Sequence, residues 1–164
     1  MSMYFHLRAV PPGRLCDDVR RLEGLFQDDW ETVRDRVGRH REEVLDKQYL
    51  DHELLYAGTP PRHMADGPPA QVVLGGRPVF HSAHGRPPFL LLTAAETERV
   101  AGYLGAADFD ELWHGSRAEL LPRYGGAGAE PEARAVFAAA HRDLTAFYTQ
   151  TAYYGDAVVK WLVL

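Results

Sequence analysis

Apolar and polar residues alternate at the start of the chain, over residues 3–10. Phe5 and Leu7 fall on one side of this alternation, and a period of two is typical of a half-buried β-strand. Residues 157–164, AVVKWLVL, are rich in β-branched and aromatic side chains and predict a second strand. Because Lys160 is the one charge in that segment, we expect the strand to lie inside a sheet rather than at its edge. We predict that the two terminal strands are neighbours.

Between these strands, apolar residues recur every three to four positions, as they do on the buried face of a helix. One predicted stripe starts after an acidic capping box at Asp28 and Glu31. It runs from Trp30 to Gln48 and is interrupted at His40, where the period asks for an apolar side chain. A polar residue at such a position must find a partner or reach the rim of the core. The predicted helical segments are 14–26, 28–48, 45–58, 93–104, 108–113 and 131–154. Thr93 with Glu96 and Asp108 with Glu111 predict caps at the starts of two of them.

Glycine and proline dominate residues 58–88, and only residues 72–74 form a short apolar run there. We interpret this Gly/Pro-rich stretch as a surface excursion, a kind of loop that is either functional or mobile. With strands at both ends and helices between them, the chain is predicted to have an α+β fold. We expect residues 1–164 to form a single compact domain, with several helices packed on a small sheet that includes the N- and C-terminal strands.

Charge and composition narrow the range of functions. The net charge of −5 argues against a general nucleic-acid binder, which needs a basic face. No apolar run approaches the roughly 20 residues that span a bilayer, so we expect no membrane partner. The single cysteine, Cys16, rules out an intramolecular disulfide, and the first residues lack the features of a secretory signal. These observations favour a cytoplasmic protein, and they leave its oligomeric state open.

Histidines offer the most obvious chemistry, starting with His81 and His84, which are three residues apart. That spacing can serve one zinc ion, but a zinc site needs three or four protein ligands and no second pair is evident. The chain also lacks a nucleophile elbow and a phosphate loop. We therefore predict neither a metal site nor a cofactor, and the catalytic residues, if any, are unknown.

The densest polar cluster beside apolar residues lies in residues 45–58. Its carboxylates could form an acid/base group in a cleft, or they could simply be solvated. A small hydrolase would use His40 or His52 with Asp46, Asp51 or Glu53. We expect His40 to be partly buried beside this segment or beside the tyrosine-rich C-terminal helix. The predicted candidate pocket consists of His40, Asp46, Tyr49, His52, Glu53 and Tyr148.

Three segments together resemble the YfbM-like family of bacterial proteins, a domain of unknown function. The first is LDKQYLDHELLYAG, from residue 45 to residue 58, and the third is the tail LTAFYTQTAYYGDAVVKWLVL. The second is the glycine-proline stretch with the capped helix that follows it. Its matching positions are Gly75, Gly76, Gly85, Pro87, Leu91, Thr93 and Glu96. The resemblance implies a compact α+β fold with helices around a small sheet, and it implies no reaction.

We therefore expect an uncharacterised, cytoplasmic YfbM-like protein that acts as a non-catalytic binding or interaction module. Its partner would be an unidentified protein or small molecule. The alternative is the hydrolase-type enzyme with a histidine-carboxylate site. A third hypothesis is a protein that neutralises a partner toxin through its acidic surface, which the net charge of −5 permits.

Overall fold

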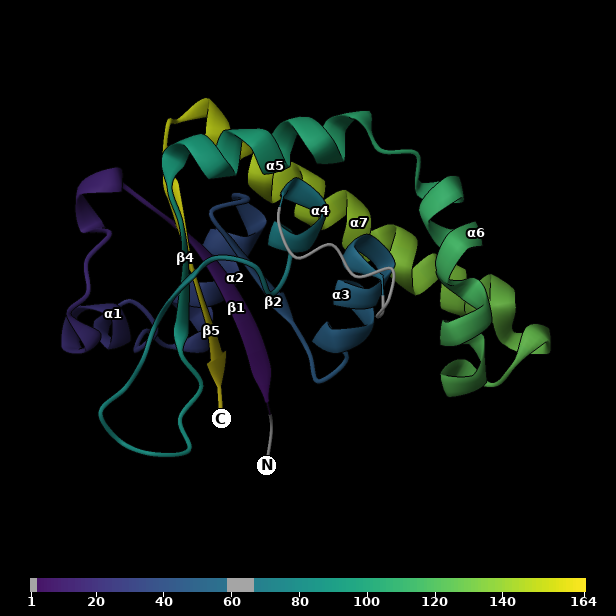
Figure 1. The fold of residues 1–164 in the computed structure, drawn as a ribbon, viewed down its shortest axis with the longest axis horizontal. Coiled ribbons are helices and arrows are strands. Elements are labelled where there is room, and N and C mark those ends of the chain that lie inside the picture. Colours follow the sequence, from purple (N-terminus) through teal and green to yellow (C-terminus); the bar gives the residue numbers. More distant parts are fainter. Residues whose placement is uncertain (1–2, 59–66) are drawn as a thin grey trace.

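A five-stranded antiparallel sheet forms the centre of the computed structural model, which describes residues 3–58 and 67–164 (Figure 1). The order of the strands across the sheet is β2-β1-β5-β4-β3. The strands are β1 (Tyr4–Val10), β2 (Glu42–Leu45), β3 (Arg77–Val79), β4 (Phe89–Leu92) and β5 (Ala157–Val163).

The two terminal strands pair with each other, as predicted. Their antiparallel register runs from Tyr4 opposite Val163 to Val10 opposite Ala157. Strand β5 is the middle strand of the five, which confirms the expectation that it lies inside the sheet. The N- and C-terminal ends of the described chain consequently lie side by side (Figure 1).

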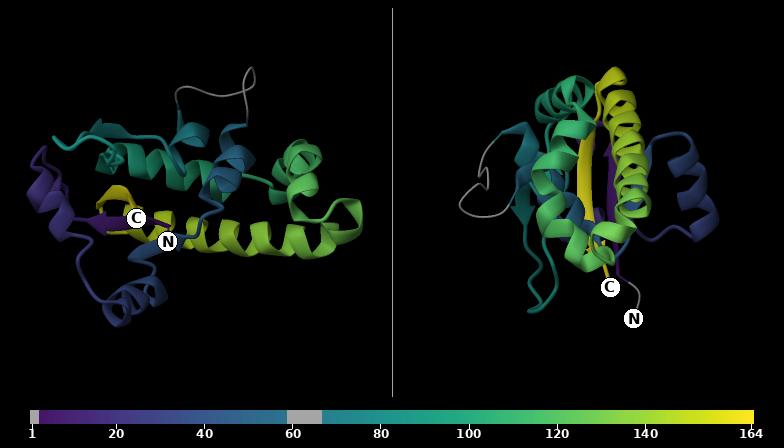
Figure 2. Two further views of the ribbon diagram at one scale, coloured as in Figure 1. Left: turned by 90° about the horizontal axis from the view of Figure 1, so that it is seen from below. Right: turned by 90° about the vertical axis from the view of Figure 1, so that its right-hand side faces the viewer.

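Helices cover both faces of the sheet (Figure 2). Two of them, α5 and α7, run alongside each other over one face, and the short helices α1 and α2 lie against the other (Figures 1 and 2). The α-helices are α1 (Val19–Gly24), α2 (Trp30–Gly38), α3 (Tyr49–Ala57), α4 (Pro68–Gln71), α5 (Ala94–Ala106), α6 (Phe109–Leu120) and α7 (Glu130–Tyr153). Three 3₁₀ turns complete the described elements: η1 (Pro12–Arg14), η2 (Leu121–Tyr124) and η3 (Ala127–Ala129).

Successive residues of each strand enter different cores because side chains alternate across a sheet. Leu7 and Val158 belong to the larger core, under α5 and α7. Val10 and Val159 belong to a smaller core that includes Leu22 of α1. The fold is therefore α+β with three layers, and one of the two helical layers is much thinner than the other.

The predicted helix 28–48 is wrong beyond Gly38. The backbone N–H of Arg41 donates to Arg36 O (2.8 Å) and that of His40 donates to Val37 O (3.0 Å), the pair of bonds that closes a Schellman motif. His40 occupies the left-handed position of this motif, with φ 58°, where glycine is usual. Because a histidine occupies this position, the sequence shows no glycine that would mark the end of the helix. The predicted helix therefore ran on into residues that form β2.

Part of the 58–88 stretch is more ordered and more buried than a surface excursion. Residues 67–79 contain α4 and β3, and Val72 and Val73 are fully buried. Gly75 packs so closely that a Cβ there would lie 2.1 Å from Ala70 O. Residues 59–66 lie outside the described residues.

The caps of α5 and α6 lie where the sequence predicts them, but the predicted capping box at Asp28 and Glu31 is wrong: α2 is capped by Asp29, which accepts a hydrogen bond from the backbone N–H of Thr32. Thr93 and Glu96 form the predicted capping box of α5, and Asp108 caps α6. The first helix is shorter than the predicted 14–26, because Asp18 accepts hydrogen bonds from the first turn of α1 and so fixes its start. Among the described residues, no helix is long and apolar enough to cross a membrane.

Candidate anion-binding pocket

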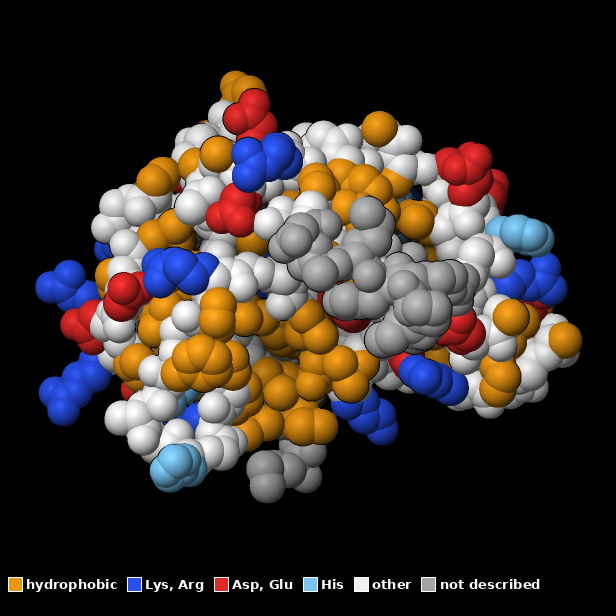
Figure 3. Space-filling view, viewed as in Figure 1, with side chains coloured by type: hydrophobic (Ala, Val, Ile, Leu, Met, Phe, Trp, Pro, Cys, Tyr) orange, Lys and Arg blue, Asp and Glu red, His pale blue; other side chains and the backbone are white. Residues whose placement is uncertain are grey.

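A pocket of about 610 Å³ opens between β1, η1 and α1. Arginine is its most frequent lining residue. We call it the arginine pocket, and its lining residues are Arg8, Gly13, Arg14, Cys16, Arg21, Gly24, Leu25 and Asp28. Figure 3 shows basic side chains projecting at the edge of the molecule where α1 lies in Figure 1.

Local sequence signals place these residues around one space. Pro11 precedes the turn η1, which carries Gly13 and Arg14 at the end of β1. Asp18 then accepts hydrogen bonds from the backbone of Arg20 (3.0 Å) and Arg21 (3.3 Å), and so starts α1. The chain thus turns sharply after β1 and returns as a short helix, which leaves the pocket between the two.

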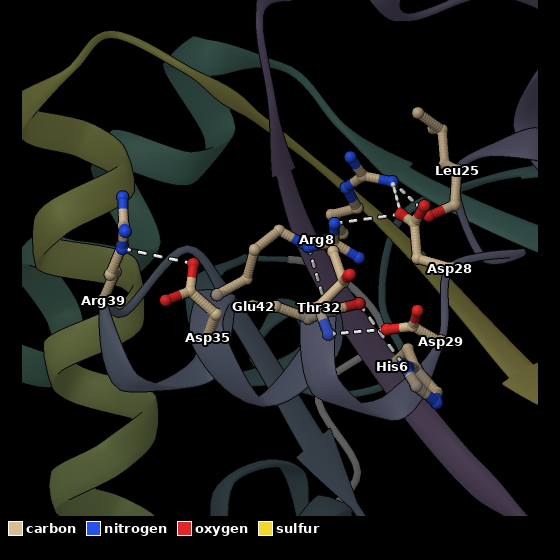
Figure 4. Close-up of polar contacts among 10 residues, drawn as sticks. His6, Arg8, Leu25, Asp28, Asp29, Thr32, Asp35, Arg39 and Glu42 are labelled. Carbon is tan, nitrogen blue, oxygen red and sulfur yellow. Dashed lines mark hydrogen bonds and ion pairs between the residues drawn. The ribbon is translucent and has the colours of Figure 1, made fainter.

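Arg8 provides the innermost charge of the pocket. Its Nη1 donates to Leu25 O and lies 3.6 Å from Asp28 Oδ2 (Figure 4). The side chain is only 19% exposed. Burial lowers the pKa of Arg8 and the charge of Arg36 lowers it further, while Glu42 and Asp28 act in the opposite direction. An anion in the pocket would offset that unfavourable environment.

Behind Arg8, a chain of ion pairs extends into the small core. Arg36 lies 2.9 Å from Asp28 and donates from Nε to Glu42 Oε2 (3.1 Å). Glu42 in turn shares a 3.3 Å hydrogen bond with His6 Nδ1 (Figure 4). Two donors in this network, Arg8 Nε and Arg36 Nη2, are buried without a hydrogen-bond partner in the described part of the chain. The network therefore has more donors than acceptors.

The rim of the pocket is also positively charged. Within residues 3–58 and 67–164, the Arg14 guanidinium forms no ion pair or hydrogen bond. Arg21 pairs with the exposed Asp18, at 3.7 Å, and exposed pairs of this kind add little stability. Three arginines against Asp28 leave the pocket lining with an excess of two positive charges, in a chain whose net charge is −5. Guanidinium groups match carboxylates and phosphates in geometry and charge.

The predicted candidate pocket is not assembled around His40. His40 is exposed, not partly buried, and it lines a shallow depression over α7 together with His141 and Arg142. Asp46 is exposed and accepts the backbone N–H of Gln48 (2.8 Å) as part of the turn before α3. These two residues therefore serve turns rather than a common site.

Tyr49 and His52 occupy different environments on α3. Tyr49 stacks on Phe5, with 5.3 Å between ring centroids. His52 is buried against Phe137, and its Nδ1 has no hydrogen-bond partner among the described residues. Burial lowers the pKa of His52, and the charges of Asp46 and Asp51 act in the opposite direction.

The carboxylates proposed for a hydrolase are engaged elsewhere. Asp51 binds Arg123 and accepts a 2.8 Å hydrogen bond from the hydroxyl of Tyr124. Glu53 Oε2 accepts the backbone N–H of Leu74 (2.8 Å). Each carboxylate thus fastens α3 to a neighbouring segment.

Glu53 and Tyr148 are the two predicted residues that the structure brings together, around the segment that follows α4. The Tyr148 hydroxyl donates to Val72 O (2.6 Å), two residues before the amide that Glu53 accepts. Lys160, which the sequence did not single out as a site, joins them: its Nζ donates to Gln71 O and to Gly75 O (2.8 Å). Burial lowers the pKa of Lys160 to about 7, against the effect of Glu53. This cluster holds the segment onto the sheet.

His81 and His84 do not share a site. The His81 side chain is 3% exposed, packs between Phe89 and Trp161, and lies 3.5 Å from Glu23. His84 is exposed. In the described ranges, no group of three or more histidine, cysteine, aspartate or glutamate side chains is arranged to hold a metal ion.

The arginine pocket was missed because its residues come from different elements. Arg8 belongs to β1, Arg14 to η1 and Arg21 to α1. Cys16, between η1 and α1, is half-buried in the pocket wall. The sequence offered one signal for this pocket, the turn PPGR at residues 11–14 close to Arg8. That signal does not show that Arg8, Arg14 and Arg21 lie around the same space in the folded protein.

Comparisons with known proteins agree on the family. Residues 1–161 match a family described as a domain of unknown function, DUF1877. The crystal structure of YfbM from Escherichia coli, a protein of unknown function, is similar with a TM-score of 0.61 and 18% identity, over 99% of this chain and 100% of that one. No curated protein matches. The resemblance noted in the sequence is thus confirmed: the chain belongs to the DUF1877 family and is a YfbM-like domain of unknown function.

Proposed function

We propose that this protein is a non-catalytic binding module of the cytoplasm that holds a small anionic ligand in the arginine pocket. The observation that carries the proposal is the convergence of Arg8, Arg14 and Arg21 on one pocket with a surplus of positive charge. The volume of about 610 Å³ lies within the range of pockets that take small organic ligands, about 300–1,000 Å³. The ligand would be the small-molecule partner expected from the sequence.

A binding role has more support than the hydrolase alternative. His52 Nδ1 has no hydrogen-bond partner within the part of the chain that the structure describes, and Asp51 is held by Arg123 and Tyr124. A general base needs a histidine or carboxylate that can reach a substrate proton. The arginine pocket instead presents permanent positive charges, which suit recognition of an anion.

Isothermal titration at low ionic strength tests the proposal, with inorganic phosphate, phenyl phosphate and benzoate as probes. We expect saturable 1:1 binding of at least one probe, and weaker binding as salt is added. The blocking variant is Gly24→Phe, because Gly24 lines the pocket and a Cβ there meets no atom within 4 Å. It should weaken binding at least tenfold while leaving the fold intact.

The matched control is Gly102→Phe, a glycine of α5 that is also exposed and also faces open space. This variant should bind as the unmodified protein does. The absence of saturable binding by every probe would refute the proposal, and so would equal binding by the Gly24→Phe and Gly102→Phe variants.

A further inference from the structure

We infer that the ligand of the arginine pocket carries a phosphomonoester group, a dianion, rather than a single carboxylate or a phosphodiester. This inference rests on the proposed function and concerns the chemical class of the ligand. Three features of the pocket lead to it: the size of its charge surplus, the position of the three guanidinium groups, and the space left beside them.

The charge surplus matches a dianion. Arg8, Arg14 and Arg21 contribute three positive charges, and Asp28 removes one. A phosphomonoester carries between 1.5 and 2 negative charges at about pH 7. A carboxylate or a phosphodiester carries one and would leave a guanidinium without a counter-charge. Neutralisation of the surplus therefore favours the monoester.

The three guanidinium groups lie at different depths in the pocket. Arg8 is largely buried at the base of the pocket, whereas Arg14 and Arg21 are exposed at its rim. Each guanidinium has five N–H donors, and a phosphomonoester offers three terminal oxygens that accept hydrogen bonds on different sides. A carboxylate has two oxygens in one plane, which one arginine can satisfy in a bidentate pair.

The negative charge of Asp28 does not oppose this arrangement. Its Oδ2 lies 3.6 Å from Arg8 Nη1 and 2.9 Å from Arg36 Nη1, so the carboxylate is shared between these two guanidinium groups. Arg36 itself is compensated by the buried Glu42. The pocket lining thus keeps its surplus of two positive charges, from Arg8, Arg14 and Arg21 against Asp28.

The pocket is larger than a phosphate ion alone requires. Leu25 lines it beside the arginines, and Gly13 and Gly24 contribute walls without side chains. A Cβ at either glycine would meet nothing within 4 Å, so the space there is open. An apolar or sugar-like group attached to the phosphate would fit in that space. A small phosphorylated molecule accounts for the charge and for the volume together.

The test compares three probes at pH 8 that share a phenyl ring: phenyl phosphate, diphenyl phosphate and benzoate. Phenyl phosphate should bind at least tenfold more tightly than each of the two monoanions, because it makes an additional charge-assisted interaction. The double variant Arg14→Gln/Arg21→Gln should reduce that preference to about threefold or less, since Arg8 remains the only pocket cation. Arg20→Gln, an exposed neighbour on α1 that does not line the pocket, is the matched control and should keep the preference.

The outcomes separate the two proposals. If none of the probes binds saturably, the anion-binding function itself fails. If the three probes bind with similar affinity and Gly24→Phe abolishes all three, the binding function stands and the phosphomonoester inference fails. If the double variant kept the full preference for phenyl phosphate over the two monoanions, the inference would also be overturned. Arg14 and Arg21 would then not contribute to the recognition of the second negative charge.

Discussion

The two faces of the sheet handle buried charge in different ways, and neighbouring residues show the contrast. Lys160 lies on the face under α5 and α7, and Trp161 lies on the face toward α1. In the same way, Glu43 and Glu42 project to opposite faces of β2. The two residues of each pair are adjacent in the sequence. The difference between their environments therefore comes from the helical layer that covers each face of the sheet.

Under α5 and α7, charge is enclosed by backbone. Lys160 is fully buried and donates to the carbonyls of the 71–75 segment. Glu43 is buried, and its one hydrogen-bond donor among the described residues is the backbone N–H of Val44 (3.1 Å). The thick helical layer leaves Lys160 without access to solvent and Glu43 with little, so their polar groups depend on partners inside the protein.

On the opposite face, charges compensate one another through side chains. The network runs from His6, which shares a hydrogen bond with Glu42, through the ion pairs of Glu42, Arg36 and Asp28 to Arg8, which reaches the arginine pocket. The layer of short helices is thin, and the network opens to solvent at one end. The thin layer of α1 and α2 therefore leaves room for a binding site. Under the thick layer of α5 and α7, the buried charges hold neighbouring segments together.

The largest effect is expected from Lys160→Ala. The substitution removes the donor for Gln71 O and Gly75 O and leaves a cavity under α5 and α7. Unsatisfied buried carbonyls and the cavity together should lower the free energy of unfolding by about 3–5 kcal/mol. Urea denaturation measures the change. The exposed Lys47→Ala is the control and should shift stability by less than about 0.5 kcal/mol; a similar small shift for Lys160→Ala would mean that the segment holds without it.

On the thin side, Glu42→Gln should destabilise by about 2–4 kcal/mol. The variant leaves the largely buried Arg36 with Asp28 as its one remaining carboxylate partner in the described part of the chain, and a buried charge that loses part of its compensation is costly. Urea denaturation at pH 7 measures this change in the free energy of unfolding. No loss of stability would show that the ion-pair network is not required on this face.

The neighbouring substitution Glu43→Gln should have the opposite sign at pH 8. Burial raises the pKa of Glu43 from 4.5 to about 7. The folded protein therefore holds this proton more tightly than the unfolded chain, so the stability it contributes is complete below pH 4.5 and is lost as pH rises through 7. Replacing the ionised group with a neutral amide should add about 1–3 kcal/mol at pH 8 and about zero at pH 4. A gain that did not depend on pH would contradict this assignment.

The smallest expected effect concerns the turn between α2 and β2. His40→Gly should stabilise the protein by about 0.5 kcal/mol, because glycine adopts the left-handed backbone at φ 58° without the steric cost that histidine carries. Part of that gain is lost to the greater freedom of glycine in the unfolded chain. Arg39→Gly, one residue earlier with φ −94°, is the control and should destabilise by a similar amount. Thermal unfolding of both variants distinguishes the two signs.

Local signals were sufficient for much of the fold. The alternation over residues 3–10 and the β-rich end at 157–164 predicted two strands, and the caps at Thr93 and Asp108 predicted two helix starts. These features depend on residues a few positions apart, which a sequence displays directly. The failure after Gly38 has the same origin, because a helix stop made with histidine in place of glycine leaves no local signal.

The candidate site depended on the tertiary structure. The sequence by itself determined that the chain forms an α+β domain with paired terminal strands, since hydrophobic period and capping fix those elements. Only the tertiary structure decided that Arg8, Arg14 and Arg21 meet in one pocket, while Lys160 and Glu53 meet under the helices. The physical reason is that the strength of a charge interaction depends on distance and burial in space. The pattern of residues along the chain contains neither quantity.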